Sequence, residues 1–250
     1  MLLLVVAGCS PPTVHRPDGP AGRSDATDTT DDTDAPCPAG MALVGSSVCV
    51  DRYEAALEVF VDGDWSPASP FEALDGSSVR AVMEEGITPQ GYISADEAET
   101  ACEASNKRLC TTDEWLAACQ GPEGWTFPYG GERVPGACND TYAGAHPVVD
   151  YFGTNEGVWD PTHMNDPGIN QQAGTVSVGG AFSQCRTPDG IFDLHGNLHE
   201  WVSDAEGTFR GGFYADASIN GPGCLYRTLA HGRRYHDYST GFRCCQDAKE

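Results

Sequence analysis

The stretch Gly190-Ile191-Phe192-Asp193-Leu194-His195-Gly196-Asn197-Leu198-His199-Glu200-Trp201 carries the strongest local pattern in the chain. Its Gly196-Asn197 pair predicts a tight turn, because both residues tolerate the left-handed backbone. Two carboxylates, Asp193 and Glu200, flank this turn. Carboxylate and carbonyl oxygens are the ligands that Ca²⁺ prefers, so a calcium site is one interpretation of the stretch. On spacing alone the preferred interpretation is a buried turn whose acids cap the backbone and form ion pairs.

Four further segments, two before this stretch and two after it, occur in a fixed order along the chain: Lys107-Arg108-Leu109-Cys110-Thr111-Thr112-Asp113-Glu114-Trp115, Phe127-Pro128-Tyr129-Gly130, Arg210-Gly211-Gly212 and Gly241-Phe242-Arg243-Cys244. With these segments, from about Cys37 to Cys245, the chain resembles the formylglycine-generating enzyme (sulfatase-modifying factor) family. The resemblance implies an irregular, loop-rich α+β fold of the C-type-lectin-like kind, held together by disulfides.

The resemblance also implies calcium ligands. It places side-chain ligands at Asp193 and Glu200 and carbonyl ligands at Gly196 and Leu198. By the same analogy, a second and weaker set of candidates lies in the loops that precede this stretch: Asn139, Asp140, Asp166 and Asn170.

Enzymes of this family oxidise a substrate cysteine with O₂ at a Cu(I) ion held by two cysteine thiolates, and soft thiolates suit Cu(I). By the resemblance, Cys224 matches the second thiolate, but the first position falls on Ile219. One thiolate does not make the two-coordinate site, so we expect neither copper nor formylglycine generation. Cys224 is then expected to form a disulfide, with Cys119 or Cys138 as its partner.

The chain contains 11 cysteines. Setting Cys9 aside leaves an even number, which in an exported chain predicts disulfides throughout. Residues 41–50 read as two strands joined by a turn at 45–47, which places Cys37 opposite Cys49. The resemblance supports a pair between Cys102 and Cys244. The adjacent Cys244 and Cys245 could form a redox switch, but two separate structural bridges are the preferred interpretation.

Residues 1–8 form an apolar run, and Val6-Ala7-Gly8-Cys9 looks like a bacterial lipobox. We interpret 1–8 as a signal peptide that carries the chain to export, truncated at its start because no Lys or Arg precedes the apolar run. Cys9 would then bear a lipid that anchors the protein to a membrane. Ser10 after it favours the outer membrane, on its periplasmic face or the cell surface. A chance apolar terminus is the alternative.

Residues 9–36 are interpreted as the lipidated cysteine and a disordered acidic linker, because prolines and the Asp/Thr run of 25–34 bury too little apolar surface to order themselves. The folded domain is expected over 37–250. Ser94 with Glu97 and Thr111 with Glu114 are capping boxes that predict two helices. The Gly-, Pro- and Asn-rich residues 121–190 predict long loops.

The charge balance excludes one class of partner. The chain has 14 Lys+Arg against 37 Asp+Glu, a net charge of -23. Nucleic acids and anionic membrane surfaces bind clustered cations, so neither is expected to be recognised directly. We expect a monomer.

A groove for a peptide or anionic ligand is predicted where basic residues gather in the sequence: His199, Arg233, Arg234 and His236. His199 occupies the position where the family usually has a groove-lining aromatic residue. Solvated loop residues are the alternative for this cluster. His195 and His199, four apart, would chelate zinc or iron on a helix, but the Gly196-Asn197 turn between them argues against a helix.

Two functions follow from these features. The favoured one is a lipid-anchored, Ca²⁺-stabilised binding or scaffold module at the cell envelope, without formylglycine-generating activity. The alternative is an oxygen-dependent oxidoreductase of the wider superfamily, which includes non-heme-iron sulfoxide synthases and a pyoverdine-maturation protein. In the synthases the iron ligands lie largely in a separate helical domain, for which this sequence offers no counterpart.

Overall fold

A computed structural model describes residues 35–229 and 231–249. The predicted signal peptide at 1–8, the lipid on Cys9 and most of the predicted linker 9–36 lie outside these residues. None of the helices in the described ranges is both long and apolar enough to cross a membrane.

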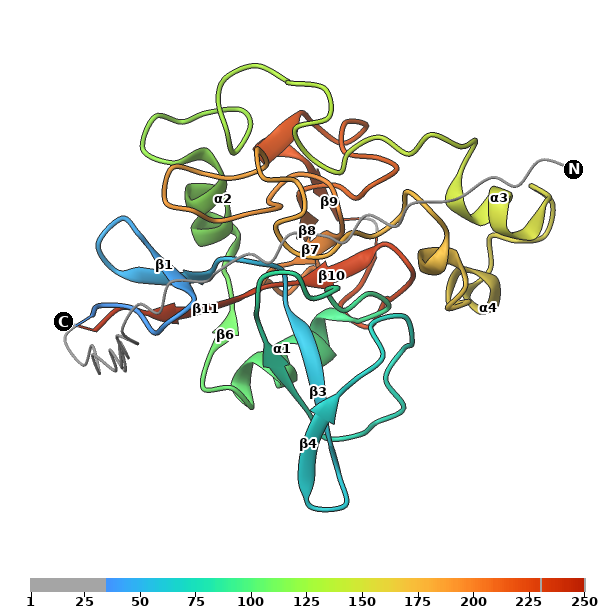
Figure 1. The fold of residues 1–250 in the computed structure, drawn as a ribbon, viewed down its shortest axis with the longest axis horizontal. Coiled ribbons are helices and arrows are strands. Elements are labelled where there is room, and N and C mark those ends of the chain that lie inside the picture. Colours follow the sequence, from blue (N-terminus) through green and yellow to red (C-terminus); the bar gives the residue numbers. More distant parts are fainter. Residues whose placement is uncertain (1–34, 230, 250) are drawn as a thin grey trace, which may run out of the picture. The chain divides into compact units, whose positions relative to one another are not determined.

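The first sheet brings the two ends of the folded region together. Its strands follow the order β1 (Met41–Val44), β2 (Val48–Asp51), β11 (Cys244–Asp247) and β6 (Arg108–Leu109). The β1–β2 hairpin, with its turn at Gly45 in the left-handed region (φ 62°), confirms the predicted strand pair. After β11 the backbone N–H of Ala248 donates to the carbonyl of Ser47 at 2.9 Å. The hairpin and the last strand therefore close the domain side by side (Figure 1).

The second sheet contains the end of the 190–201 stretch. Its order is β10 (Thr240–Phe242), β7 (His199–Trp201), β8 (Phe209–Arg210) and β9 (Arg227–Thr228). β7 and β10 are parallel, with Glu200 opposite Gly241. A third sheet, in the order β4 (Asp64–Pro67), β3 (Ala56–Val61) and β5 (Val79–Val82), ends in a hairpin that projects away from the other elements (Figure 1).

The two longest helices in the described ranges begin where the capping boxes predict. α1 (Ala95–Glu103) has Ser94 as its N-cap and α2 (Thr112–Gln120) has Thr111, and both reciprocal side-chain bonds are present in each. Long loops cover most of 121–190, as predicted, and three short helical segments interrupt them. Those opened by proline, α3 and α4, are capped by His146 and Asp160, and proline at the first helical turn has no N–H to leave unbonded. The short segments in order are α3 (Pro147–Phe152), α4 (Pro161–Met164) and η1 (Ile169–Gln171), with η2 (Gly223–Leu225) later.

Every cysteine in the described ranges is in a disulfide. The pairs are Cys37–Cys49, Cys102–Cys244, Cys110–Cys245, Cys119–Cys224 and Cys138–Cys185. The first two match the predicted pairs, and adjacent Cys244 and Cys245 belong to separate bridges. Of the two partners considered for Cys224, the structure contains Cys119.

Candidate functional site

The Gly196-Asn197 turn has the backbone that its sequence predicts. Gly196 has φ 81° and Asn197 has φ 57°, both in the left-handed region. A Cβ added to Gly196 would lie 2.1 Å from the backbone oxygen of Asn139. The close approach of these two backbone segments therefore requires glycine at position 196. Asn197 Oδ1 accepts from Asn139 Nδ2 at 2.9 Å and from the N–H of Ser177 at 2.8 Å. The turn therefore joins three loops into one buried network.

Glu200 lies beside this turn in a fully buried ion pair. Its two oxygens accept from Arg243, Nε to Oε2 and Nη2 to Oε1, both at 2.6 Å. Trp115 Nε1 donates to Oε2 at 2.7 Å. Arg243 completes its bonds on the carbonyls of Asp51 and Phe192, at 2.9 and 2.8 Å. Each of the three guanidinium nitrogens of Arg243 therefore donates to an oxygen of the protein.

Two more carboxylates are buried nearby. Glu54 accepts from the N–H of Leu198 at 3.0 Å and from the Asn197 amide. Burial, together with the negative charges of Asp193 and Glu200, raises the pKa of Glu54 well above its usual value. Burial raises the pKa of Asp193 to about 6, although the N–H of Gly180 donates to it at 2.8 Å. Arg243 is the cation that offsets this negative charge.

These contacts do not fit a calcium ion at Glu200. Ca²⁺ takes roughly six to eight oxygen ligands, whereas both Glu200 oxygens are engaged by Arg243 and Trp115. An ion there would have to displace a buried guanidinium. In the described part of the chain, no group of three or more His, Cys, Asp or Glu residues could hold a metal ion. The Glu200 carboxylate therefore does not fit the calcium site that the resemblance implies at Asp193, Gly196, Leu198 and Glu200.

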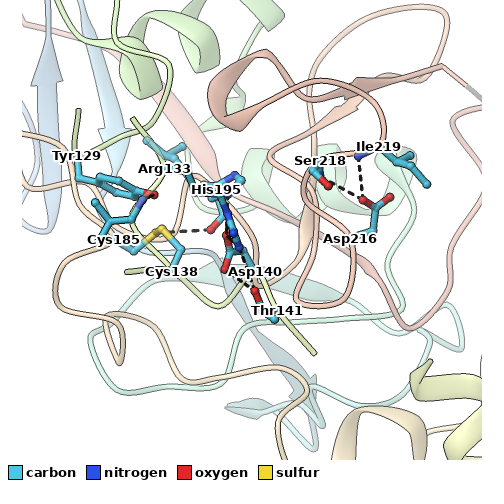
Figure 2. A network of polar contacts seen from close by, with 12 residues as sticks. Tyr129, Arg133, Cys138, Asp140, Thr141, Cys185, His195, Asp216, Ser218 and Ile219 are labelled. Atoms are coloured by element: carbon cyan, nitrogen blue, oxygen red, sulfur yellow. Dashed lines mark hydrogen bonds and ion pairs between the residues drawn. A yellow bond between two sulfur atoms is a disulfide. The ribbon is translucent and has the colours of Figure 1, made fainter. Parts of the chain in front are cut away.

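The weaker calcium candidates are also engaged by protein groups. Asp140 Oδ2 accepts from Arg133 Nη2 at 2.7 Å and lies 3.3 Å from His195 Nε2, as Figure 2 shows. Burial alone would raise the pKa of Asp140, but the hydrogen bonds from His195 and Arg133 outweigh it and hold the pKa below its usual value. Asn170 donates to the carbonyl of Tyr238 at 2.6 Å and accepts from Tyr214 Oη at 2.7 Å. The side chains of Asp140 and Asn170 are therefore already hydrogen-bonded within the protein.

The positions that match the copper thiolates point to different surroundings. Cys224 is buried in its disulfide with Cys119. Ile219 is 80% exposed, on a turn where its N–H and that of Ser218 donate to Asp216 Oδ1 at 3.0 and 3.1 Å (Figure 2). The two positions thus differ in burial as well as in chemistry: Cys224 is a buried sulfur, and Ile219 is an exposed hydrocarbon side chain.

A groove of about 470 Å³ opens beside Ile219. His199 forms part of its wall, packed among the rings of Phe209, Phe213 and Tyr226 at centroid distances of 4.4, 4.9 and 5.4 Å. The remaining lining residues come from five segments: His146, Met164, Ala215, Asp216, Ser218, His231, Tyr235, Asp237, Tyr238 and Ser239. We call this cavity the aromatic groove.

The predicted cluster of basic groove residues is only partly assembled. His199 lines the aromatic groove, but Arg233 turns to α1, where it pairs with Asp96 at 2.8 Å and Glu99 at 2.6 Å. Arg234 is almost fully exposed, and His236 Nδ1 contacts Asn165 Oδ1 at 2.8 Å. The carboxylates of α1 neutralise Arg233, so the groove is not basic.

Sequence reasoning did not find most of the groove. His146, Phe209, Phe213 and Tyr238 come from separate loops and strands, and no local pattern links them. Their common signal is composition, because loops rich in aromatic residues must pack those rings on one another or around a ligand.

His199 is held neutral. Nδ1 of His199 lies 3.1 Å from Ser239 Oγ, and Nε2 lies 3.2 Å from the Tyr226 hydroxyl. Burial, then the neighbouring His231, lowers the pKa of His199 to about 3. The ring is therefore uncharged at neutral pH.

We predict that the imidazole signals of His199 in an NMR titration stay unchanged until the pH approaches 3. The unfolded chain protonates this ring near its ordinary pKa, so His199 by itself contributes a loss of stability of about 1.4 kcal/mol per pH unit as the pH falls below about 6.5. The same protein in urea is the control, with the ring titrating near its ordinary value. A His199 signal that titrates near pH 6 in the folded protein would contradict this assignment.

Comparisons with known proteins find one family model and several solved structures that resemble this chain. A family model described as the sulfatase-modifying factor enzyme 1-like domain matches residues 41–249. PvdO from Pseudomonas aeruginosa is 14% identical over 80% of this chain and 80% of that chain, with a TM-score of 0.49. CarF is 14% identical over 81% of this chain and 87% of that chain, with a TM-score of 0.45. The Major Tropism Determinant I1 variant is 13% identical over 86% of this chain and 54% of that chain, with a TM-score of 0.48. No curated protein matches the chain.

Proposed function

The chain belongs to the sulfatase-modifying factor enzyme 1-like family and has its C-type-lectin-like fold, and we propose that it is an exported binding module that does not generate formylglycine. The observation that carries this proposal is the state of Cys224, whose sulfur is bonded to Cys119. A sulfur in a disulfide is neither a thiolate nucleophile nor a Cu(I) ligand. Ile219, at the other thiolate position, offers no sulfur.

The aromatic groove is the proposed binding surface. It is concave, about 470 Å³ in volume, and lined by rings with a few polar groups between them, as small-molecule and side-chain sites usually are. Ile219 and Ser218 stand at this groove, whereas Cys224 does not line it. The ligand is proposed to be a peptide segment rather than an anion, because Arg233 is paired with carboxylates of α1.

An oxidising location supports the same function. Five disulfides join the ten cysteines of the described ranges, and such density is typical of exported proteins. We propose that Cys9 carries the lipid and that residues 9–36 tether the domain at the cell envelope, with outer-membrane placement resting on Ser10. Palmitate labelling of the full chain, abolished by Cys9→Ala, tests the anchor.

The catalytic part of the proposal is tested by restoring thiols one at a time. We predict that wild type and Ile219→Cys bind no Cu(I) and oxidise no peptide cysteine, because Cys224 stays bonded to Cys119. Ile219→Cys adds one maleimide-reactive thiol at an exposed position. Combining it with Cys119→Ala also frees the Cys224 sulfur, so both thiolate positions carry a free thiol only in this double variant, which is the comparison for the Cu(I) measurement. Copper-dependent formylglycine formation by the wild-type protein would overturn the proposal.

A further inference from the structure

The aromatic groove carries negative but no matching positive charge. Neither Lys nor Arg occurs among its lining residues in the described ranges, whereas Asp216 and Asp237 both do. Asp237 is buried and accepts from Tyr235 Oη at 2.5 Å and from Ser239 Oγ and N–H at 2.7 and 2.8 Å. Asp216 Oδ2 accepts from Tyr226 Oη at 3.2 Å. Neutral donors orient both carboxylates, and within the described ranges no ion pair neutralises either one.

The histidines of the groove add no positive charge at neutral pH. Burial lowers the pKa of His146 and of His231, and burial with the neighbouring His231 lowers that of His199. Burial raises the pKa of Asp237, as expected of a carboxylate without a cation nearby. A cation entering the groove would meet no like charge and would stabilise the ionised form of Asp237.

Ring faces line the same space. His231 stacks on Tyr235 with centroids 3.6 Å apart, and Phe213 lies 5.8 Å from Tyr238. The negative faces of such rings attract ammonium and guanidinium groups, more strongly when water is excluded. Aromatic rings and carboxylates together are the groups that bind an organic cation. An anion in the groove would find no positively charged side chain to pair with.

We propose that the aromatic groove binds the cationic side chain of a lysine or arginine in a partner peptide. This inference rests on the proposed binding function and names its ligand class. The long alkyl stem of such a side chain would lie against Ile219, Phe213 and the other apolar lining, and its charged end would lie toward Asp237 and Asp216. The charge of the chain as a whole, -23, favours the approach of a basic peptide.

The test is calorimetric titration of the full-length protein with three N-acetyl amino-acid amides at one ionic strength: lysine, arginine and norleucine. Norleucine keeps the alkyl stem and lacks the charge. We expect the cationic amides to bind about tenfold more tightly than norleucine amide. Equal affinities for lysine and norleucine amides would overturn the cation inference and leave a binding groove. Absence of binding by all three would overturn it as well, whereas only thiol chemistry at Cys224 bears on the loss of catalysis.

Matched variants separate the groove from the diffuse charge of the protein. Tyr235→Leu and Asp216→Asn are expected to abolish most of the preference for lysine over norleucine amide, and Tyr235→Phe is expected to retain it because the ring remains. The controls outside the groove are Tyr151→Leu, at an exposed ring, and Asp62→Asn, at an exposed carboxylate, and both should keep the full preference. A preference that survives both Tyr235→Leu and Asp216→Asn would overturn the proposal.

Discussion

Replacing Glu200 by glutamine is expected to lower the free energy of unfolding by about 3–5 kcal/mol, because it leaves a buried guanidinium without its counter-ion. Arg243 is fully buried and its Nε and Nη2 groups both donate to Glu200 at 2.6 Å. Glutamine keeps the shape of the side chain, so the loss measures charge rather than packing. Urea unfolding of the full-length protein gives the value.

The control is the same substitution in a half-exposed pair. Arg80 and Glu58 lie 2.6 Å apart on the third sheet, with side chains 38% and 24% exposed, and Glu58→Gln should cost at most about 1 kcal/mol. Because the structure pairs Glu200 with Arg243, the loss at Glu200 should be equal in Ca²⁺ and in chelator. A loss seen only with Ca²⁺ present would show that the carboxylate binds an ion, as the family resemblance implied.

Features set by neighbouring residues could be predicted from the sequence. The turn at Gly196-Asn197 and the capping boxes at Ser94 and Thr111 depend on backbone preferences and on bonds across three or four positions. The irregular α+β fold was predicted by the resemblance that the five ordered motifs carry. The turn and the helix starts were thus predicted from local sequence rules, and the fold was predicted from the family resemblance.

The ligation state of the acids could not be predicted, because it depends on distant residues. Ion-paired acids were one of the two interpretations of the 190–201 stretch, but the partner of Glu200, Arg243, lies 43 positions later, and Glu54 bonds to Leu198 across 144 positions. The composition of a stretch gives its number of charged residues. It does not identify the oppositely charged residues that the fold places beside them.

The basic cluster illustrates the same limit in the groove. Arg233 and His199 are both in loops or strands near the second sheet, yet Arg233 faces α1, where Asp96 and Glu99 lie in the first turns of the helix. The partners of Arg233 precede it by more than 130 positions. The groove is therefore acidic and aromatic where the sequence predicted a basic one.

Removing the Cys102–Cys244 bridge by Cys102→Ala with Cys244→Ala is expected to cost about 3 kcal/mol, because with the neighbouring Cys110–Cys245 bridge intact it closes only a short additional loop in the unfolded chain. This bridge joins residues 142 positions apart, from α1 to β11, and both sulfurs are buried in the core with Trp201 and Phe242. Such a loss is a large fraction of the stability of an ordinary domain. Thermal and urea unfolding of the full-length variant measure it, with the other bridges left intact.

The matched control is the short bridge Cys37–Cys49, which spans 12 positions. Closing a loop of that size also stabilises by about 3 kcal/mol in the chain-entropy account, so its double alanine variant should lose about as much. If instead the Cys102–Cys244 variant loses clearly more, packing of its buried sulfurs in the core adds to loop closure. If the Cys37–Cys49 variant loses more, the hairpin that closes the domain beside β11 depends on its bridge more than the α1–β11 connection does.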